Sequence, residues 1–123
     1  MSQKDHSALA IITAFNAAFN RHDVDGLMSL MTEDCIFENT SPPPDGTRCE
    51  GQAAVRATFE AIFAASPRLT FDYEETVALG ERGFVRWVYS WDNGSHDRGH
   101  IRGVDLLRLR DGKIVEKLSY VKG

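Results

Sequence analysis

The sequence has 123 residues, which fits one domain over residues 1–123 and leaves little room for a second. Its composition, 42% hydrophobic and 26% charged, is that of an ordinary globular chain, and its net charge of −4 provides no basic excess for binding nucleic acid phosphates. The longest apolar run, residues 8–12, is far shorter than the ~20 residues of a membrane span, and no secretory signal is visible. We therefore expect a cytoplasmic protein with neither a membrane nor a nucleic acid as its partner.

Three helices are predicted in the first half of the chain. Apolar residues recur every three or four positions over residues 6–20, which is typical of a helix with one buried face. Asp23 is a plausible N-cap for a short second helix, in which Leu27 and Met31 share a face. A third helix begins at residue 51 and is stopped at residue 66 by the proline that follows.

Residues 35–39 form a short β-prone run between the second and third helices. Three consecutive prolines and an Asp-Gly pair then predict a stiff loop over residues 42–46.

From residue 69 onward the hydrophobic period changes from 3.6 to 2, which indicates β-strands. The predicted strands are residues 69–79, 84–91, 101–110 and 114–122. Asn93-Gly94 and Asp111-Gly112 predict tight turns, because these residues tolerate positive φ. Three helices followed by an antiparallel meander predict an α+β fold, in which a curved, mostly antiparallel sheet wraps around the helices and leaves a cone-shaped cavity.

Asp105 is the candidate functional residue of the third of these strands. It alternates there with Ile101, Gly103, Leu107 and Leu109, so we expect it on the mostly apolar inner face. A carboxylate among aliphatic side chains has to be paired, hydrogen-bonded or protonated, and a raised proton affinity suits a general acid near neutral pH. The alternative is a structural aspartate, hydrogen-bonded to a neighbouring backbone group or to an arginine.

Arg86 is the expected partner of Asp105. If Asn93 and Gly94 are the two turn residues, Arg86 faces Ile101 and shares the inner face with Asp105. An inward arginine would hold the carboxylate ionised or bind an anionic substrate group. One β-bulge would reverse this assignment and leave Arg86 on the solvated surface.

The same register places large side chains on the opposite face of that strand: Val85, Trp87, Tyr89 and Trp91. Aromatic and arginine side chains interleaved on a β surface resemble a nucleic-acid stacking platform, but the negative net charge argues against that function. The same residue types are enriched at protein interfaces. We therefore predict a homodimer that forms through this face of the sheet.

The predicted hairpin tip holds a cluster of residues with metal-ligand chemistry: Asp92, His96, Asp97 and His100. Their spacing matches no known site, and two cysteines without CxxC spacing indicate neither a zinc site nor a disulfide scaffold, so we predict no metal. The sequence contains no nucleophile elbow, phosphate loop or dinucleotide fingerprint, and we expect no organic cofactor.

Three segments extend over nearly the whole chain: AFNRHDVDGLMSLMTEDCIFEN, EGQAAVRATFEAIF and GVDLLRLRDGKIVEKLSYVKG. In this order they resemble the SnoaL-like branch of the nuclear-transport-factor-two-like superfamily. The resemblance implies an α+β cone, commonly homodimeric, with an apolar pocket facing the helices. Members include polyketide ring cyclases, ketosteroid isomerase, limonene epoxide hydrolase, dehydratases and non-catalytic binding modules, so the resemblance implies no single reaction.

Asp105 is the one position at which the functional residues of that superfamily carry over. It stands where SnoaL-like cyclases keep an acid/base aspartate and where ketosteroid isomerase keeps a protonated aspartic acid. Asn39 and Phe15 stand where the isomerase has its proton-abstracting carboxylate and its hydrogen-bonding tyrosine, and neither can perform that chemistry. Gly103 and Ser119 replace the arginine and the second aspartate of the epoxide hydrolase.

These observations support two hypotheses. One is a module that binds a small, apolar, ring-bearing molecule in the cone without turning it over. The alternative is a cofactor-independent acid/base enzyme of the polyketide cyclase, isomerase or dehydratase type, in which Asp105 moves a proton on a small carbonyl substrate. Asn39, Arg86 and Tyr120 are then the candidate donors to an enolate oxygen, and Phe15 is also expected at the substrate.

Overall fold

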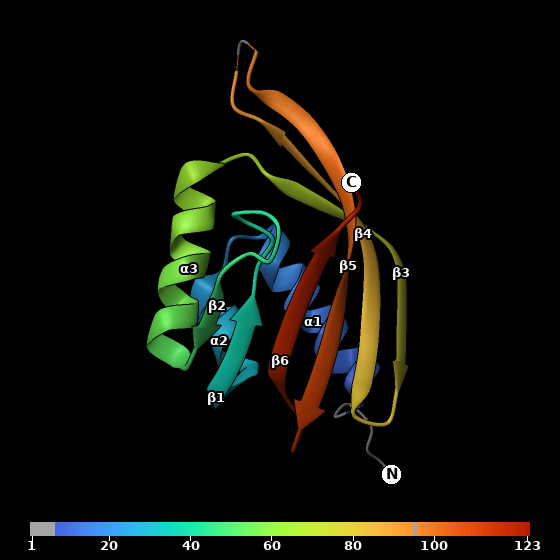
Figure 1. Cartoon of the computed structure of the whole chain (residues 1–123). Coiled ribbons are helices and arrows are strands. Elements are labelled where there is room, and N and C mark those ends of the chain that lie inside the picture. The colour runs from blue at the N-terminus through green and yellow to red at the C-terminus, as the bar shows by residue number, and fades with distance from the viewer. Residues whose placement is uncertain (1–6, 95) are drawn as a thin grey trace.

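The structure is a computed structural model that describes residues 7–94 and 96–123 (Figure 1). Within these residues there are three helices and six strands. The helices are α1 (Ala8–Asn20), α2 (Val24–Ser29) and α3 (Gln52–Ala65). The strands are β1 (Met31–Glu38), β2 (Arg48–Glu50), β3 (Thr70–Leu79), β4 (Arg82–Asp92), β5 (Arg98–Arg110) and β6 (Lys113–Val121).

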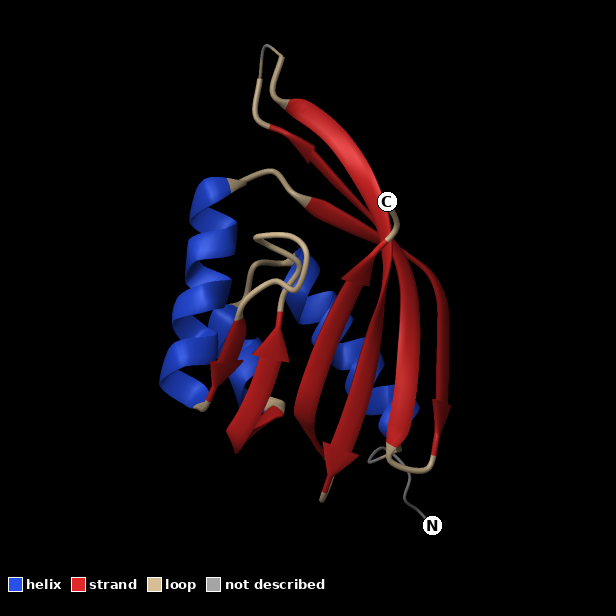
Figure 2. Ribbon diagram, viewed as in Figure 1, coloured by secondary structure: helices blue, strands red, loops and turns tan. Residues whose placement is uncertain are grey.

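The strands form one mixed sheet in the order β2-β1-β6-β5-β4-β3. Strands β3 to β6 are successive antiparallel neighbours, whereas β1 runs parallel to β6. The helices lie on one side of this curved sheet, and β4 and β5 extend beyond them as a long hairpin (Figures 1 and 2). The α+β fold predicted from the sequence, with three helices on a curved and mostly antiparallel sheet, is therefore confirmed.

Helix α1 turns one apolar face towards the sheet. Ser7 is its N-cap, because the hydroxyl of Ser7 accepts a hydrogen bond from the Ala10 N–H at 3.1 Å. Ile12 and Phe15 are almost completely buried on the inner face. The helix ends at Asn20 as the periodicity predicts, whereas the first residue of the predicted range, residue 6, lies outside the described residues.

Helix α2 begins as predicted and ends earlier than its hydrophobic spacing suggests. Asp23 is the N-cap, and its carboxylate accepts a backbone hydrogen bond at 2.9 Å. The helix stops because the Leu30 carbonyl accepts a hydrogen bond from the Ile114 N–H at 2.8 Å, where β1 meets β6. The β-prone run at residues 35–39 is consequently part of a longer strand that begins at Met31.

Aromatic rings fill the space between α1, α3 and the sheet. Phe59 of α3 lies edge-on to Phe15 and Phe19 of α1, with ring centroids 6.1 and 5.8 Å apart. Phe19 also meets Phe71 of β3 edge-on at 5.2 Å. Burying a ring of this size stabilises the fold by about 1.5–3 kcal/mol, so this cluster is a large part of what fixes the helices against the sheet.

The turn between β5 and β6 has the predicted form. Arg110 pairs with Lys113, and the two residues between them, Asp111 and Gly112, have φ angles of 54° and 77°. An Asp-Gly pair favours this turn because both central residues need positive φ.

The hairpin between β4 and β5 differs from the prediction. The Asn93 N–H donates a hydrogen bond to the Asp97 carbonyl at 2.8 Å, so Asn93 belongs to the paired ladder and not to the turn. Side chains extend the pairing, because the Asn93 amide and the Trp91 indole both donate to the Asp97 carboxylate, at 3.1 and 3.2 Å. The prediction that Asn93 and Gly94 are the two turn residues is therefore wrong.

This longer connection displaces the register of β4 and β5 by three residues. Arg86 pairs with Val104 instead of Ile101, and Val85 pairs with Asp105. Because side chains alternate between the two faces of a sheet, an odd displacement exchanges the faces. Arg86 therefore points away from the face that carries Asp105.

In the part of the chain that the structure describes, none of the helices combines the length and the apolar character needed to cross a membrane.

Candidate functional site

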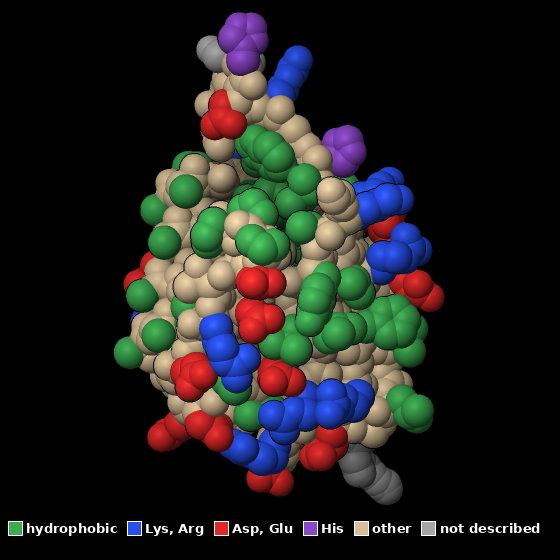
Figure 3. Space-filling model, in the orientation of Figure 1, with side chains coloured by type: hydrophobic (Ala, Val, Ile, Leu, Met, Phe, Trp, Pro, Cys, Tyr) green, Lys and Arg blue, Asp and Glu red, His purple; other side chains and the backbone are tan. Residues whose placement is uncertain are grey.

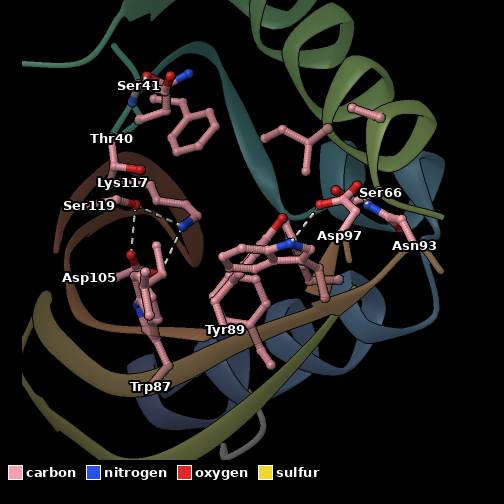
Figure 4. A pocket seen from close by; sticks show the side chains of 18 residues that line it. Thr40, Ser41, Ser66, Trp87, Tyr89, Asn93, Asp97, Asp105, Lys117 and Ser119 are labelled. Carbon is pink, nitrogen blue, oxygen red and sulfur yellow. Dashed lines mark hydrogen bonds and ion pairs between the residues drawn. The ribbon is translucent and has the colours of Figure 1, made fainter. Parts of the chain in front are cut away.

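A cavity of about 440 Å³ opens between α3, the loop after β1 and the β4–β5 hairpin. Figure 3 shows hydrophobic side chains gathered below the tip of that hairpin. Six of the residues that line the cavity are aromatic: Phe19, Phe37, Phe71, Trp87, Tyr89 and Trp91. Figure 4 shows Tyr89 between two groups of polar side chains, one around Asp105 and the other around Asp97.

Two tryptophans of β4 are part of the wall because glycines lie opposite them on β5. Trp87 pairs with Gly103, and Trp91 pairs with Gly99. A Cβ atom on Gly99 would lie 3.0 Å from the Trp91 ring, and one on Gly103 would overlap the Trp87 ring. Each ring therefore occupies the space that a side chain on β5 would otherwise fill.

The position of these tryptophans corrects the predicted dimer face. Val85 and Trp87 are 0% and 3% exposed, and Tyr89 and Trp91 line the cavity. At Val85 and Trp87 this face of β4 is turned towards the helices and belongs to the core and the cavity wall, not to the outer face of the sheet. The error comes from the predicted register of the hairpin, which placed these four side chains on the outer face of the sheet.

Asp105 lies at the base of the cavity, as the alternation along its strand predicts, and its residue is 4% exposed. The Lys117 ammonium donates to its Oδ2 at 2.8 Å, and the Ser119 hydroxyl donates to its Oδ1 at 2.7 Å. Lys117 Nζ also donates to Ser119 Oγ at 3.2 Å, which closes a ring of three polar groups (Figure 4). Asp105 thus has the buried, paired environment that its sequence context required.

Sequence reasoning missed Lys117 because of a β-bulge. A two-residue turn at residues 111–112 by itself would pair Asp105 with Leu118 and place Lys117 on the outer face. The register instead shifts between Arg108 and Leu109, so that Asp105 pairs with Ser119. The signal in the sequence is a lysine in the interior of the last strand, and its face depends on a bulge that the turn does not reveal.

Lys117 is embedded among aromatic rings as well as beside a carboxylate. Its residue is 6% exposed, and its ammonium lies 4.9 Å from the ring centroid of Phe37 and 6.0 Å from that of Phe19. A cation near the face of an aromatic ring is attracted by its quadrupole, more strongly where water is excluded. The carboxylate of Asp105 and these rings together compensate the desolvation of the ammonium.

Tyr73 of β3 lies behind the cavity wall. Its hydroxyl donates to the Asn16 carbonyl of α1 at 3.3 Å. Burial raises the pKa of Tyr73 well above its ordinary value, and the negative charge of Asp105 adds to the effect. Tyr73 therefore acts as a neutral hydrogen-bond donor across the whole physiological pH range.

Arg86 lies outside the cavity, on the outer face of the sheet. Its guanidinium pairs with Glu74 at 3.0 Å and with Glu75 at 3.4 Å, and its side chain is 53% exposed. Asp105 is paired with Lys117 instead, so the expected Arg86–Asp105 contact is absent from the described part of the chain.

Phe15 lies in the core, 2% exposed, and is not among the residues that line the cavity. Asn39 does line the cavity, but its side chain holds the loop at the mouth. Its Oδ1 accepts the Thr47 N–H at 2.7 Å and the Ser41 N–H at 3.3 Å.

Tyr120 is 50% exposed and lines a second hollow, of about 320 Å³, between the end of β6 and the loop after β1. A bulge in β6 is the reason, because the unpaired Val115 exchanges the faces of Lys117 and Tyr120. The structure thus brings together Asp105 and Asn39 in one cavity and leaves Arg86, Phe15 and Tyr120 outside it.

Over residues 7–94 and 96–123, no group of three or more histidine, cysteine, aspartate or glutamate side chains is placed to hold a metal ion. At the hairpin tip, Asp97 accepts hydrogen bonds from Trp91 and Asn93, and His96 and His100 are exposed.

Comparisons with known proteins identify the fold. A family model described as a SnoaL-like domain matches residues 12–117. An NTF2-like protein of unknown function from Mesorhizobium loti is 40% identical in sequence, and its crystal structure superposes with a TM-score of 0.81. The match covers 100% of this chain and 98% of that chain. No curated protein sequence matches.

Two more distant crystal structures share the fold. One is a protein from Xanthomonas campestris, provisionally named a polyketide cyclase, at 20% identity, 94% and 90% coverage of this and that chain, and a TM-score of 0.74. The other is TerC co-crystallised with polyporic acid, at 19% identity, 94% and 91% coverage and a TM-score of 0.78. The family match extends over most of the chain and the architecture agrees with it. The chain therefore belongs to the SnoaL-like domain family, with the NTF2-like, cystatin-like α+β fold.

Proposed function

We propose that this protein binds a small, apolar, ring-bearing molecule in the cavity beneath the β4–β5 hairpin. The observation that carries the proposal is the cavity itself: about 440 Å³, walled by aromatic rings and closed at its base by a buried polar group. Ligand pockets of ~300–1,000 Å³ with mostly apolar walls and a few placed polar groups are typical of small-molecule sites. The co-crystallised ligand of TerC supports the same use of this fold.

Intrinsic fluorescence offers a direct test, because the chain has two tryptophans and both line the cavity. Titration with naphthalene-type compounds is expected to change the emission of Trp87 and Trp91 and to raise the melting temperature by mass action. Ala65→Phe narrows the mouth of the cavity and is expected to weaken binding, whereas Ala61→Phe, exposed on the same helix, is the matched control. If no ring-bearing compound changes either signal, the proposal is wrong.

A second candidate function is acid/base catalysis by Asp105, and the observation that favours it is a buried carboxylate at the base of an apolar cavity. In the simplest step, the C–H bond next to a ketone breaks, its proton moves to the Asp105 carboxylate, and the electron pair forms an enolate. Exchange of that hydrogen for deuterium in D2O, followed by NMR, measures the step. Asp105→Asn is expected to abolish exchange at ketone concentrations at which fluorescence still shows binding, and equal exchange in this variant would eliminate the enzyme hypothesis.

We also propose that the protein forms a homodimer through the outer face of the sheet. This face carries a row of apolar residues across β4, β5 and β6: Phe84, Leu106 and Leu118. Leu106 is 44% exposed, and Arg86 and Arg102 flank the row in ion pairs with Glu74. Apolar surface framed by arginine is typical of protein interfaces.

Light scattering after gel filtration tests the dimer. Leu106→Glu is expected to give a monomer, because two copies would place like charges in one apolar interface. Leu9→Glu is the matched control, since Leu9 is 49% exposed on α1, away from the sheet. A monomeric wild-type protein, or a Leu106→Glu variant that remains dimeric, contradicts this proposal.

A cytoplasmic location is likewise proposed, and the state of the cysteines supports it. Cys35 and Cys49 are both free thiols, which fits a reducing compartment. Because Cys35 is buried, the test is alkylation during lysis of the cells in denaturant, after which mass spectrometry would show both thiols modified; an oxidised pair would oppose this location.

A further inference from the structure

We infer that Lys117 is the residue that receives the ligand, as the hydrogen-bond donor to a carbonyl oxygen, and that the ligands are neutral ring ketones and quinones. This inference rests on the proposed function, ligand binding in the cavity. It assigns the polar contact to Lys117, in place of Asn39, Arg86 and Tyr120.

The ammonium of Lys117 has one donor more than its protein partners use. An ammonium carries three N–H bonds. Two of them point to Asp105 and Ser119, and among the described residues no third oxygen accepts from it. The remaining surroundings are the rings of Phe37 and Phe19, which attract a cation but accept a hydrogen bond less well than oxygen does.

A second buried donor lies in the same wall. The indole N–H of Trp87, a residue that is 3% exposed, has no hydrogen-bond partner within residues 7–94 and 96–123. Both Asp105 oxygens, by contrast, already accept a hydrogen bond. Donors are therefore in excess at the base of the cavity, and an incoming acceptor fits better than an incoming donor.

The charges that line the cavity favour a neutral acceptor over an anion. The lining holds one ammonium, that of Lys117, and two carboxylates, those of Asp105 and Asp97. An anionic ligand would have to overcome this excess of negative charge in a partly desolvated site. A carbonyl group offers the same oxygen lone pairs without a net charge, and the flat aromatic walls suit a fused ring.

The ion pair with Asp105 and the contact with Ser119 give Lys117 a fixed direction. A long lysine side chain normally loses rotamer freedom, at a cost in free energy, when it is held in one geometry. Here that cost is met on folding, because Asp105 and Ser119 orient the ammonium before any ligand arrives. The third donor is thus already positioned for a carbonyl oxygen.

A matched pair of probes tests the inference: 1-tetralone, a fused-ring ketone, and tetralin, the same ring system without the carbonyl. Both are titrated into the wild-type protein and followed by tryptophan fluorescence. A hydrogen bond to a charged donor is worth about 1.5–3 kcal/mol, so 1-tetralone is expected to bind roughly tenfold to a hundredfold more tightly. The carbonyl carbon of 13C-labelled 1-tetralone is expected to shift downfield in the NMR spectrum of the complex.

The variants separate a ligand contact from a structural role. Lys117→Met combined with Asp105→Asn removes both charges together, so neither is left buried alone. This double variant is expected to bind tetralin as the wild type does and to lose both the preference for 1-tetralone and the 13C shift. Lys113→Met, at an exposed lysine of the same strand that does not line the cavity, is the control and is expected to retain both.

Each outcome is decisive. If tetralin binds but 1-tetralone binds no more tightly, or if the preference survives in the double variant, the role of Lys117 is wrong while the proposed function stands. Tighter binding of 1-naphthoate than of 1-tetralone would overturn the assignment to neutral carbonyl compounds. If neither 1-tetralone nor tetralin binds, the proposed function fails and the inference fails with it.

Discussion

The ring of Trp87 lies where a side chain on Gly103 would be, directly across the ladder between β4 and β5. A methyl group at residue 103 would overlap both this ring and the backbone carbonyl oxygen of Tyr120. The ring could move only into the cavity, and the backbone of β6 has little freedom to yield.

Gly103→Ala is therefore expected to destabilise the protein by about 1–3 kcal/mol, the usual cost of overpacking. Gly99→Ala is the comparison, because its methyl group would meet only the Trp91 ring, at 3.0 Å, and no backbone atom. We expect this variant to be destabilised less, because a side-chain ring yields by a few tenths of an ångström more easily than backbone does. Urea unfolding followed by tryptophan fluorescence measures both variants. Equal stability of the two variants would show that the Trp87–Gly103 contact does not constrain the sheet.

The buried pair of Asp105 and Lys117 predicts a strongly non-additive pair of substitutions. Lys117→Met alone leaves an unpartnered carboxylate, and Asp105→Leu alone leaves an unpartnered ammonium, so each is expected to cost about 3–5 kcal/mol. The combination of both substitutions is expected to cost much less than their sum, because it leaves no isolated charge. Chemical unfolding at pH 7 gives the three free energies, and additive values would mean that the two groups do not interact.

The fold could be predicted from the sequence because its signals are local and repeated. The 3.6-residue period of α1 and α3 and the alternation after residue 69 each extend over many residues, and Asp111-Gly112 fixes its turn. The burial of Asp105 followed from the same alternation. None of these features depends on which strand lies beside which.

Which residues form the site could not be predicted, because that depends on the register of the paired strands. One longer hairpin connection at Asn93 turned Arg86 outward and Trp87 inward, and one bulge in β6 exchanged Lys117 for Tyr120. The hairpin displaces the strand register by three residues and the bulge displaces it by one, and tertiary hydrogen bonds set both. Because each displacement is odd, every side chain beyond it lies on the opposite face of the sheet. The parallel pairing of β1 with β6 is likewise a contact between distant segments that no local pattern indicates.

Asn39 offers a test of whether its amide donates to a ligand or only holds the loop. Its Oδ1 accepts two backbone N–H groups of the loop, so Asn39→Ala is expected to cost about 1 kcal/mol per lost hydrogen bond and to weaken ligand binding. Asn39→Asp keeps an acceptor but has no amide donor, and it is expected to restore both stability and affinity. If Asn39→Asp folds normally and still loses affinity, the amide contacts the ligand directly.

Tyr73 predicts a defined loss of stability at alkaline pH. Burial, with the charge of Asp105 adding to it, raises the pKa of Tyr73 in the folded protein above the value near 10 of an unfolded chain. Below about pH 10 the phenol is protonated in both states, and its contribution to stability is complete. Above that pH the unfolded chain releases the proton and the folded chain retains it, so the free energy of unfolding falls as pH rises towards the folded-state pKa.

Tyr73→Phe removes this slope, at a cost near neutral pH of about 1 kcal/mol for the hydrogen bond to Asn16. Melting temperatures from pH 8 to pH 11 measure it, with Tyr120→Phe on the exposed outer face as the matched control, and an unchanged alkaline slope in Tyr73→Phe would assign the loss to other groups.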